Sequence, residues 1–336
     1  MVTIKDVALA ADVSTATVSR VIADKPHVSD AVRTKVMAAV EKLGYRPNLV
    51  AQNLRAQQSK ILGLLVSDIQ NSFFRHISRA VEDTAHQNGY SVILCNTDEN
   101  PDKEKMYLQL MQDQNTAGII LSPTRKACSE FDRILKLNIP LAIIDRRVAD
   151  FDIDNIFTDN IALAEKLTSH FCENGYQKIA GLFGDSSTTG IERHQGYLTA
   201  LKKAGRNVPK ELVRFVAPRE QTGYETALEL LELALPPDAI FTSNSLLAVG
   251  VLQAIKEKNL SIPGQIGLAT FDDTSWAKLV TPSITVVDQP AYEIGQTATE
   301  MLIKRIKDPG RSAREVILKG NLIVRQSSGP PEKKGH

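Results

Sequence analysis

The sequence has little cysteine and no long apolar run, and both absences narrow the class of protein. Cys95, Cys128 and Cys172 are far apart and form no C-x-x-C pair. This spacing disfavours a disulfide framework or a zinc site and favours reduced thiols in the cytoplasm. No stretch of about 18 consecutive apolar residues occurs, so we expect no membrane span. The chain opens on a helical pattern with no apolar signal segment, which again favours the cytoplasm.

The motifs of several enzyme classes are also missing. A dinucleotide-binding enzyme would carry G-x-G-x-x-G after its first strand, but no glycine occurs between Asp68 and Gly89. There is no P-loop, no G-x-S-x-G and no cluster of metal ligands. We therefore expect no enzyme activity, no cofactor and no metal. A sugar-processing enzyme on a doubly wound fold stays open as a distant alternative.

The first sixty residues predict an all-α head built from short helices. Four helices are expected: about Ile4–Ala11, Thr15–Ile22, Ser29–Leu43 and Leu49–Ala56. Thr3 and Asp6 are spaced as a capping box for the first helix, and Ser14, Ser29 and Asn48 can cap the others. Gly44 should end the third helix.

The second expected helix has the geometry of a helix-turn-helix recognition helix. Thr15, Ala16 and Arg20 lie on the face opposite its valines, within about 140° of arc. Arg20 could donate two hydrogen bonds to a guanine or hold a phosphate, and the methyl groups of Thr15 and Ala16 suit a thymine methyl. Three short hydroxyl side chains could reach phosphate oxygens: Ser14, Thr17 and Ser19.

The segments Thr3–Ile22 and Val28–Leu54 resemble the signature of the LacI/GalR family of bacterial transcription regulators. The resemblance implies a homodimer on a near-palindromic operator of double-stranded DNA, with Leu54 of a hinge helix wedged into the minor groove. Residues 1–57 hold eight Lys and Arg against five Asp and Glu, a mild basic bias. The expected DNA-binding residues are Thr3, Ser14, Thr15, Ala16, Thr17, Ser19, Arg20, His27, Ser29, Tyr45, Asn48, Ala51, Leu54 and Arg55.

From Ile61 onward, strand-length apolar runs alternate with helix-length amphipathic stretches, which predicts doubly wound parallel sheets. Expected strands are Ile61–Asp68, Ser91–Asn96, Ala117–Ser122, Leu141–Asp145, Asn155–Thr158, Lys178–Gly184, Leu212–Val216, Ala239–Thr242, Ile266–Phe271, Ile284–Val287, Glu315–Leu318 and Asn321–Val324. Expected helices are Phe73–Asn88, Lys103–Gln114, Leu163–Asn174, Arg193–Ala204, Gly223–Leu235, Leu247–Lys258 and Tyr292–Lys307. Two series of strands predict two lobes.

The resemblance implies that this part is an α/β domain like the periplasmic sugar-binding proteins, used for effector binding and dimerisation. The predicted limits are a head at 1–57, with its hinge helix at 48–56, and an effector domain at 61–336. Lobe one is expected at about 61–159 and 290–317, and lobe two at about 160–288 and 318–328. An exported sugar-binding protein is a weaker alternative, because it would have no DNA-binding head.

Ligands of open α/β sheets bind at the carboxyl ends of the strands. The expected strand ends carry aromatic, carboxylate, amide and arginine side chains, which suit a polyhydroxylated ligand. Arg193, Asp272 and Asn244 match the family's effector-binding positions, and Ser245, where the family usually has Asp, is expected to cap the next helix. The expected effector-binding residues are Phe73, Phe74, Arg146, Ser187, Thr189, Arg193, Asn244, Asp272, Trp276 and Gln289.

The charge of the effector stays open at this point. Arg193 and Arg146 could hold a carboxylate or phosphate, so a sugar acid or a sugar phosphate stands beside a neutral sugar. A hinge helix of eight residues is too short to be stable alone and should fold only when paired with its twin on DNA. We expect the effector to weaken operator binding by a repressor, with corepression and dual regulation as alternatives. No heptad pattern follows Val324, which favours a dimer over a tetramer.

Overall fold

The computed structural model describes residues 2–22, 25–26, 28–45, 59–124, 134–148, 151–185, 187–207 and 210–331. The chain divides into two compact units, residues 1–59 and 60–336, which we call the head and the effector unit. The hinge helix predicted at 48–56 and Cys128 lie outside the described residues. Cys95 and Cys172 are free thiols. No helix of the described part is both long and apolar enough to cross a membrane.

The described part of the head contains three helices at the predicted positions: α1 (Ile4–Ala11), α2 (Thr15–Ile22) and α3 (Asp30–Leu43). Apolar residues from all three form its core: Val7, Ala8, Ala11, Val18, Val21, Val36 and Ala39. Burial of Val18 and Val21 fixes the inner face of α2, as the periodicity predicted. The opposite face of α2 is therefore free to contact a partner.

Local capping sets the ends of these helices. The Asp6 carboxylate accepts hydrogen bonds from the Thr3 backbone N–H at 2.7 Å and from its hydroxyl at 2.8 Å, which lowers the pKa of Asp6. The Ser14 hydroxyl accepts from the Thr17 N–H at 3.1 Å, as predicted. Ser29 is a correction, because it occupies the N-cap position of α3 but its side chain makes no capping hydrogen bond.

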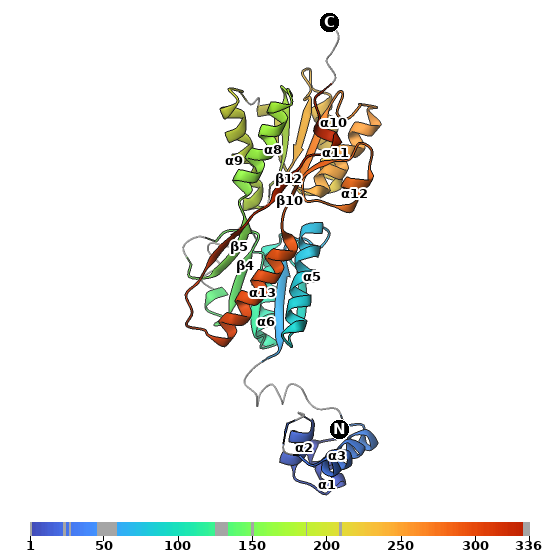
Figure 1. Ribbon diagram of the computed structural model, residues 1–336, viewed down its shortest axis with the longest axis vertical. Coiled ribbons are helices and arrows are strands. Elements are labelled where there is room, and N and C mark those ends of the chain that lie inside the picture. Colours follow the sequence, from blue (N-terminus) through green and yellow to red (C-terminus); the bar gives the residue numbers. More distant parts are fainter. Residues whose placement is uncertain are drawn as a thin grey trace. The chain divides into compact units, whose positions relative to one another are not determined.

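The effector unit alternates strands and helices through most of its length (Figure 1). Its strands are β1 (Ile61–Val66), β2 (Ser91–Asn96), β3 (Gly118–Leu121), β4 (Leu141–Ile144), β5 (Asp154–Thr158), β6 (Ile179–Gly184), β7 (Val213–Val216), β8 (Ala239–Thr242), β9 (Gly267–Phe271), β10 (Thr285–Asp288), β11 (Glu315–Leu318) and β12 (Asn321–Ile323). Its helices are α5 (Ser72–Gln87), α6 (Pro101–Asp113), α8 (Asn160–Glu173), α9 (Thr188–Lys203), α10 (Glu220–Leu231), α11 (Ser245–Glu257), α12 (Ser275–Leu279) and α13 (Ala291–Lys307).

These strands form two six-stranded sheets, one in each lobe. The lobe-one order is β11-β5-β4-β3-β1-β2, and every pair is parallel. The lobe-two order is β12-β10-β9-β8-β6-β7, in which only β12 runs antiparallel to its neighbour β10. In both sheets the strand order reverses beside the first strand of the lobe, which is where ligands of such sheets bind.

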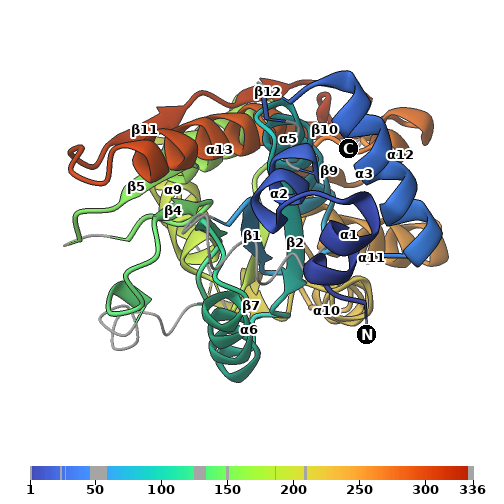
Figure 2. The ribbon, with the colours of Figure 1, turned by 90° about the horizontal axis from the view of Figure 1, so that it is seen from below.

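Helices cover both faces of each sheet, which explains the nearly continuous apolar runs of the central strands. In lobe one, α5 and α13 lie over one face and α6 over the other (Figure 2). Leu64 and Leu65 of β1 point to opposite faces and enter two different cores. In lobe two, α10 and α11 pack on one face and α8 and α9 on the other.

The chain passes between the lobes three times. The passages lie between β5 and α8, between β10 and α13, and between β11 and β12. Each passage is only a few residues long, and Figure 1 shows the chain crossing between the lobes near the labels β5, β10 and β12. Three short parallel connections leave the lobes free mainly to rotate against each other, which is hinge geometry.

Several helix ends differ from the predicted ones by a few residues, as at α8 and α10, and two elements differ most. Helix α9 begins at Thr188, not near Arg193, because the Ser187 hydroxyl caps the Gly190 N–H at 3.0 Å. The predicted start was late because the serine, threonine and glycine residues before Arg193 have the composition of a loop. Helix α12 was not predicted at all, since five residues give no measurable period.

Gly250 offers a test of the packing of α10 against α11. A Cβ at this position would lie 2.0 Å from the Glu220 carbonyl oxygen. Gly250→Ala is therefore expected to lower the free energy of unfolding by about 1–3 kcal/mol, because the backbone of a neighbouring helix must move. The measurement is urea unfolding followed by circular dichroism. Gly310→Ala is the control, since the nearest atom there is 3.8 Å away; equal stability losses would contradict the close helix packing.

Candidate functional site

The outward face of α2 presents the residues predicted to contact bases. Thr15, Ala16 and Arg20 are exposed, as is Ser14, while Thr17 and Ser19 are half-buried. The Ser14 and Thr17 hydroxyls lie 2.9 Å apart and hydrogen-bond to each other. A short helix with one polar, unshielded face and one buried apolar face is suited to lie in a major groove.

The other predicted DNA-contacting residues lie outside the exposed face of α2, and some of them also make contacts within the head. Tyr45 packs against the core of the head, and the Thr3 hydroxyl donates to Asp6 in the cap of α1. Ser29 is exposed just before α3. Five predicted contacts lie outside the described residues and stay predictions: His27, Asn48, Ala51, Leu54 and Arg55.

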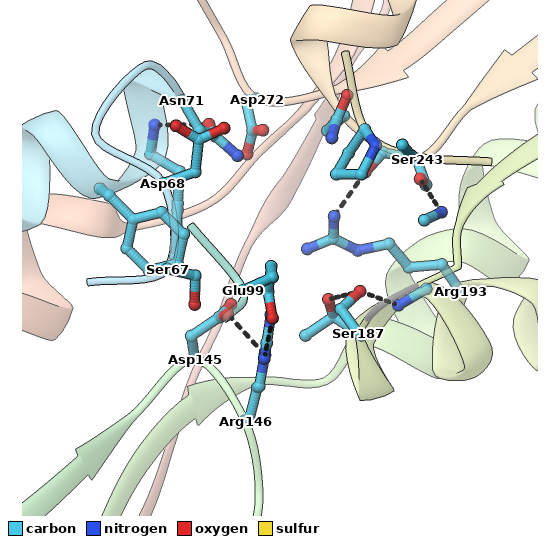
Figure 3. Close-up of a pocket in the computed structure, with 18 of the residues that line it drawn as sticks. Ser67, Asp68, Asn71, Glu99, Asp145, Arg146, Ser187, Arg193, Ser243 and Asp272 are labelled. Atoms are coloured by element: carbon cyan, nitrogen blue, oxygen red, sulfur yellow. Dashed lines mark hydrogen bonds and ion pairs between the residues drawn. The ribbon is translucent and has the colours of Figure 1, made fainter. Parts of the chain in front are cut away.

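The effector unit contains a cleft of about 270 Å³ at the carboxyl ends of its strands. Its walls come from both lobes, with Glu99, Asp145 and Arg146 on one side and Ser187 and Arg193 on the other (Figure 3). The cleft thus lies at the predicted carboxyl ends of the strands, and the structure places it beside the point where the strand order reverses in both sheets. Among the described residues, no group of three or more His, Cys, Asp or Glu side chains is arranged to hold a metal.

Two phenylalanines form the apolar part of the lobe-one wall. Asn71 caps α5 by accepting the Phe73 N–H at 3.0 Å, which places Phe73 and Phe74 in the first helical turn. Their ring centroids are 5.2 Å apart in an edge-to-face arrangement. Both side chains line the cleft and also belong to the lobe-one core. Packing therefore holds these rings rigidly at the wall.

The charged part of the same wall follows β2 and β4. Arg146 is buried, and both of its terminal nitrogens donate to the Glu99 carboxylate, with Nη1–Oε2 at 2.9 Å. Nη1 also donates to the Pro123 carbonyl oxygen at 2.5 Å. The Arg146 Nε lies 3.6 Å from the Asp145 carboxylate and has no hydrogen-bond partner among the described residues. Burial raises the pKa of Asp145 to about 6, against the opposing effect of Arg146.

Arg193 dominates the lobe-two wall. Its Nε donates to Asn160 Oδ1 at 2.9 Å, and its Nη1 donates to the Ser243 carbonyl oxygen at 2.5 Å. The guanidinium carbon lies 4.0 Å from the centroid of the Phe271 ring, a cation–π contact. Burial lowers the pKa of Arg193, and the carboxylates of Asp272 and Asp145 oppose that effect. Arg193 is thus fixed at three points before any ligand binds.

Asp272 completes the lobe-two wall and is linked to the crossovers. Gln289 Nε2 donates to Asp272 Oδ1 at 2.7 Å, and Gln289 Oε1 accepts the Thr158 hydroxyl at 2.9 Å. Thr158 and Gln289 stand at two of the three passages between lobes. The other carboxylate oxygen, Asp272 Oδ2, is buried and makes no hydrogen bond of good geometry among the described residues, although the nearby Ser245 backbone N–H acts to lower the pKa of Asp272. Burial raises the pKa of Asp272.

Helix caps occupy the rest of this wall. Asn244 accepts the Leu247 N–H at 2.9 Å and is the N-cap of α11. The predicted capping role of Ser245 is therefore wrong, because Ser245 is already the first residue of that helix. Ser187 likewise caps α9 and accepts the Thr189 hydroxyl at 3.0 Å. The side chains of Asn244 and Ser187 are therefore held in place by the helices that they cap, and a ligand would meet them in these fixed positions.

The structure brings together nine of the ten predicted effector-binding residues along the cleft: Phe73, Phe74, Arg146, Ser187, Thr189, Arg193, Asn244, Asp272 and Gln289. Trp276 is the exception, because α12 packs its ring against the lobe-two core and not toward the cleft. Glu99 and Arg219 line the cleft without having been predicted. Glu99 lies beyond the end of β2 in a left-handed conformation (φ 56°), which no hydrophobic period signals.

Comparison with known proteins identifies the family. Residues 3–48 match the model of the bacterial regulatory proteins of the lacI family, and residues 59–325 match that of the periplasmic binding proteins and sugar binding domain of the LacI family. The ribose operon repressor of Halalkalibacterium halodurans is 34% identical, with 98% of this chain and 97% of that protein covered. The chain belongs to the LacI family and is a DNA-binding transcriptional regulator.

Solved structures agree with this assignment. The lac repressor dimer bound to operator and the anti-inducer ONPF has a TM-score of 0.85 at 26% identity, covering 98% of this chain and 99% of that one. A LacI family regulator from Enterococcus faecium with bound ribose has a TM-score of 0.73 at 26% identity, covering 80% and 99%. The predicted family and fold class are confirmed, and these relatives are regulators, not enzymes.

The raised pKa of Asp145 predicts a pH dependence of stability. A carboxyl group with a pKa near 6 in the folded protein, against an ordinary 3.8, binds a proton more readily when folded. Stability from this group is therefore lost as the pH rises from about 4 to about 6, by roughly 3 kcal/mol. Asp145→Asn should become more stable relative to the parent over that range, measured by urea unfolding without ligand. The control is Asp113→Asn at an exposed carboxylate; a difference that stays flat with pH would contradict the burial argument.

Proposed function

We propose that this regulator is a repressor whose operator affinity is controlled by a small polyhydroxylated effector, a sugar or sugar derivative, bound in the cleft. One observation carries the choice of ligand. Arg146 Nε, a donor, and Asp272 Oδ2, an acceptor, are both buried and make no hydrogen bond of good geometry among the described residues, and they come from opposite lobes. A hydroxyl group both donates and accepts, so a molecule with several hydroxyls satisfies both walls at once.

The apolar surfaces of the cleft fit the same ligand class. Phe73 and Phe74 offer rings to the C–H faces of a sugar, while the amide and hydroxyl groups nearby pair with its oxygens. The ribose-bound Enterococcus faecium regulator, which shares this fold, supports a monosaccharide as the first ligand to test. We expect the ligand to be bound and released unchanged.

Operator recognition is assigned to the head. We infer that α2 enters the major groove with Thr15, Ala16 and Arg20 toward the bases, and that a homodimer presents two heads to a near-palindromic operator. The similarity to the operator-bound lac repressor dimer supports this arrangement. A regulator of this kind acts where the chromosome is, so we expect it in the bacterial cytoplasm.

Coupling between the two sites follows from the crossovers. A ligand held by both walls favours one angle between the lobes, and Gln289 connects Asp272 of the cleft to Thr158 at a passage. We expect that angle to disfavour pairing of the two hinge segments at 48–56, so that the effector weakens operator binding. By linkage, operator DNA must then weaken effector binding by the same factor.

The experiment that tests this proposal uses the full-length protein with neutral sugars, sugar acids and sugar phosphates. Ligand binding is measured by thermal shift and calorimetry, where about 2.7 kcal/mol of added stability is expected at 100 times the dissociation constant. Operator binding is then measured by fluorescence anisotropy with and without each ligand. Weaker operator binding supports induction, stronger binding means corepression, and a lack of any sugar ligand overturns the sugar-effector proposal.

Asp272→Asn tests the lobe-two wall. The amide places a donor where the buried Oδ2 offers an acceptor, so effector affinity should fall roughly 10- to 100-fold, while ligand-free operator binding is retained. Calorimetry and operator anisotropy measure the two properties. Asp113→Asn, at the exposed end of α6, makes the same chemical change away from the cleft and serves as the control. Undiminished effector affinity in Asp272→Asn would remove this residue from the site.

Arg20→Ala tests the recognition face of α2. If Arg20 reads a base through its two-nitrogen fork, the loss on the cognate operator is about 1–3 kcal/mol, with little change on random DNA. Arg20→Lys keeps the charge but not the fork, so it should lose nearly as much. Full affinity in Arg20→Lys, or an equal loss on random DNA, would show that Arg20 contacts only phosphate.

A further inference from the structure

The cleft contains more negative than positive groups. Three arginines line it: Arg146, Arg193 and Arg219. Six carboxyl side chains line it as well: Asp68, Asp98, Glu99, Asp145, Asp185 and Asp272. An anionic ligand would have to displace or outcompete some of these carboxylates, whereas an uncharged ligand would not. Whether the cleft can bind an anionic ligand therefore depends on whether one of the three arginines is available to pair with it.

Arg146 already makes with Glu99 the paired hydrogen bonds that it would otherwise make with an anionic ligand. Its two terminal nitrogens grip the two oxygens of Glu99, which is the fork-to-fork geometry of arginine with a carboxylate. The Pro123 carbonyl takes a further N–H bond. Glu99 also raises the pKa of Arg146, so the arginine stays charged and its charge is balanced inside the wall.

The backbone holds Glu99 in place at some energetic cost. Asp98 and Glu99 both have left-handed backbone conformations, with φ of 51° and 56°. Two consecutive non-glycine residues in this region are unusual and cost free energy. The Glu99 N–H donates to the Ser67 carbonyl oxygen at 3.3 Å, and the Asp98 carboxylate is bonded by Asn96 at 2.7 Å. The turn after β2 thus delivers the Glu99 carboxylate to Arg146.

The other two arginines are less suited to an anion. Arg193 uses Nε and Nη1 on Asn160 and Ser243, and its positive charge lies in the field of Asp272 and Asp145. Arg219 is exposed at the start of α10 and lies in the field of the carboxylates of Asp68 and Asp98. Neither has the enclosed, doubly bonded position that Arg146 occupies.

We propose that the cleft selects an uncharged polyhydroxylated ligand, and that Glu99 sets this selectivity by occupying the terminal nitrogens of Arg146. This inference rests on the proposed sugar-binding function of the cleft. It assigns Glu99 a role in specificity: because Glu99 occupies both terminal nitrogens of Arg146, a sugar acid or sugar phosphate finds no free arginine fork on the lobe-one wall. Removing that one charge should open the cleft to anions.

Glu99→Gln tests the proposal in the full-length protein. The probes are matched pairs: D-ribose and D-ribose 5-phosphate, D-glucose and D-glucuronate, D-galactose and D-galacturonate. The readout is the ratio of anion affinity to neutral-sugar affinity within each pair, measured by calorimetry at fixed ionic strength. The parent protein should bind the neutral member more tightly, and Glu99→Gln should raise the ratio at least about tenfold, because a charged fork is freed.

Two further variants separate the release of Arg146 from a general change of charge. Asp98→Asn removes one negative charge from the neighbouring residue, whose carboxylate is paired with Lys103, and should raise the ratio much less. The double variant Glu99→Gln/Arg146→Gln should lose the anion affinity that Glu99→Gln gains. Thermal unfolding and ligand-free operator binding check that each variant is folded.

The outcomes distinguish this inference from the proposed function. If the parent protein binds the acid or phosphate more tightly than the neutral sugar, the charge selectivity is overturned and the sugar effector stands. An equal gain in Asp98→Asn and Glu99→Gln overturns the role of Glu99. If the parent protein binds no sugar of either kind, the sugar-effector proposal fails and this inference fails with it. Should Glu99→Gln not fold, the parent's own preference within each pair still decides the charge selectivity.

Discussion

The structure of the effector unit depends on burying charged side chains at the cleft, where the carboxyl ends of the strands of the two lobes face each other. Arg193 is buried in this region, and its charge is tolerated because an amide oxygen, a carbonyl oxygen and an aromatic face surround it. Arg146 is tolerated through Glu99 in the same way. A buried charge needs all of its partners, so these groups hold the strand ends in fixed positions. That rigidity gives a ligand two preformed walls to bridge.

The second constraint is that the walls belong to lobes joined by three short passages. Gln289 and Thr158 stand at two of them and share a hydrogen bond. Since Gln289 also lines the cleft, the cleft and the hinge between the lobes have residues in common. A ligand that contacts Asp272 and Arg146 acts on both lobes at once. Differential contact with two lobe angles is the physical requirement for control of a distant DNA site.

Much of this architecture could be predicted from the sequence, because buried parallel strands and amphipathic helices leave strong local patterns. Leu62–Val66 reads as a fully buried strand, and α2 reads as a helix with one apolar face. The capping pair Thr3 and Asp6 was predictable for the same reason, since both partners lie within one turn. Trp276 was assigned to the cleft wrongly, because the short helix α12 directs its ring toward the core.

The sequence by itself determined the two sheets, the helix-turn-helix head and most of the residues at the strand ends, since these follow from periodicity, capping and strand order. Only the tertiary structure decided which of those residues pair with one another. Glu99 and Arg146 are 47 positions apart, and Arg193 meets the Ser243 carbonyl across 50 positions. Such pairings depend on how the loops leave neighbouring strands, and on left-handed residues such as Asp98 and Glu99. Hydrophobic patterns predict neither the path of these loops nor the left-handed residues, because such patterns indicate burial and not the direction of a polar side chain.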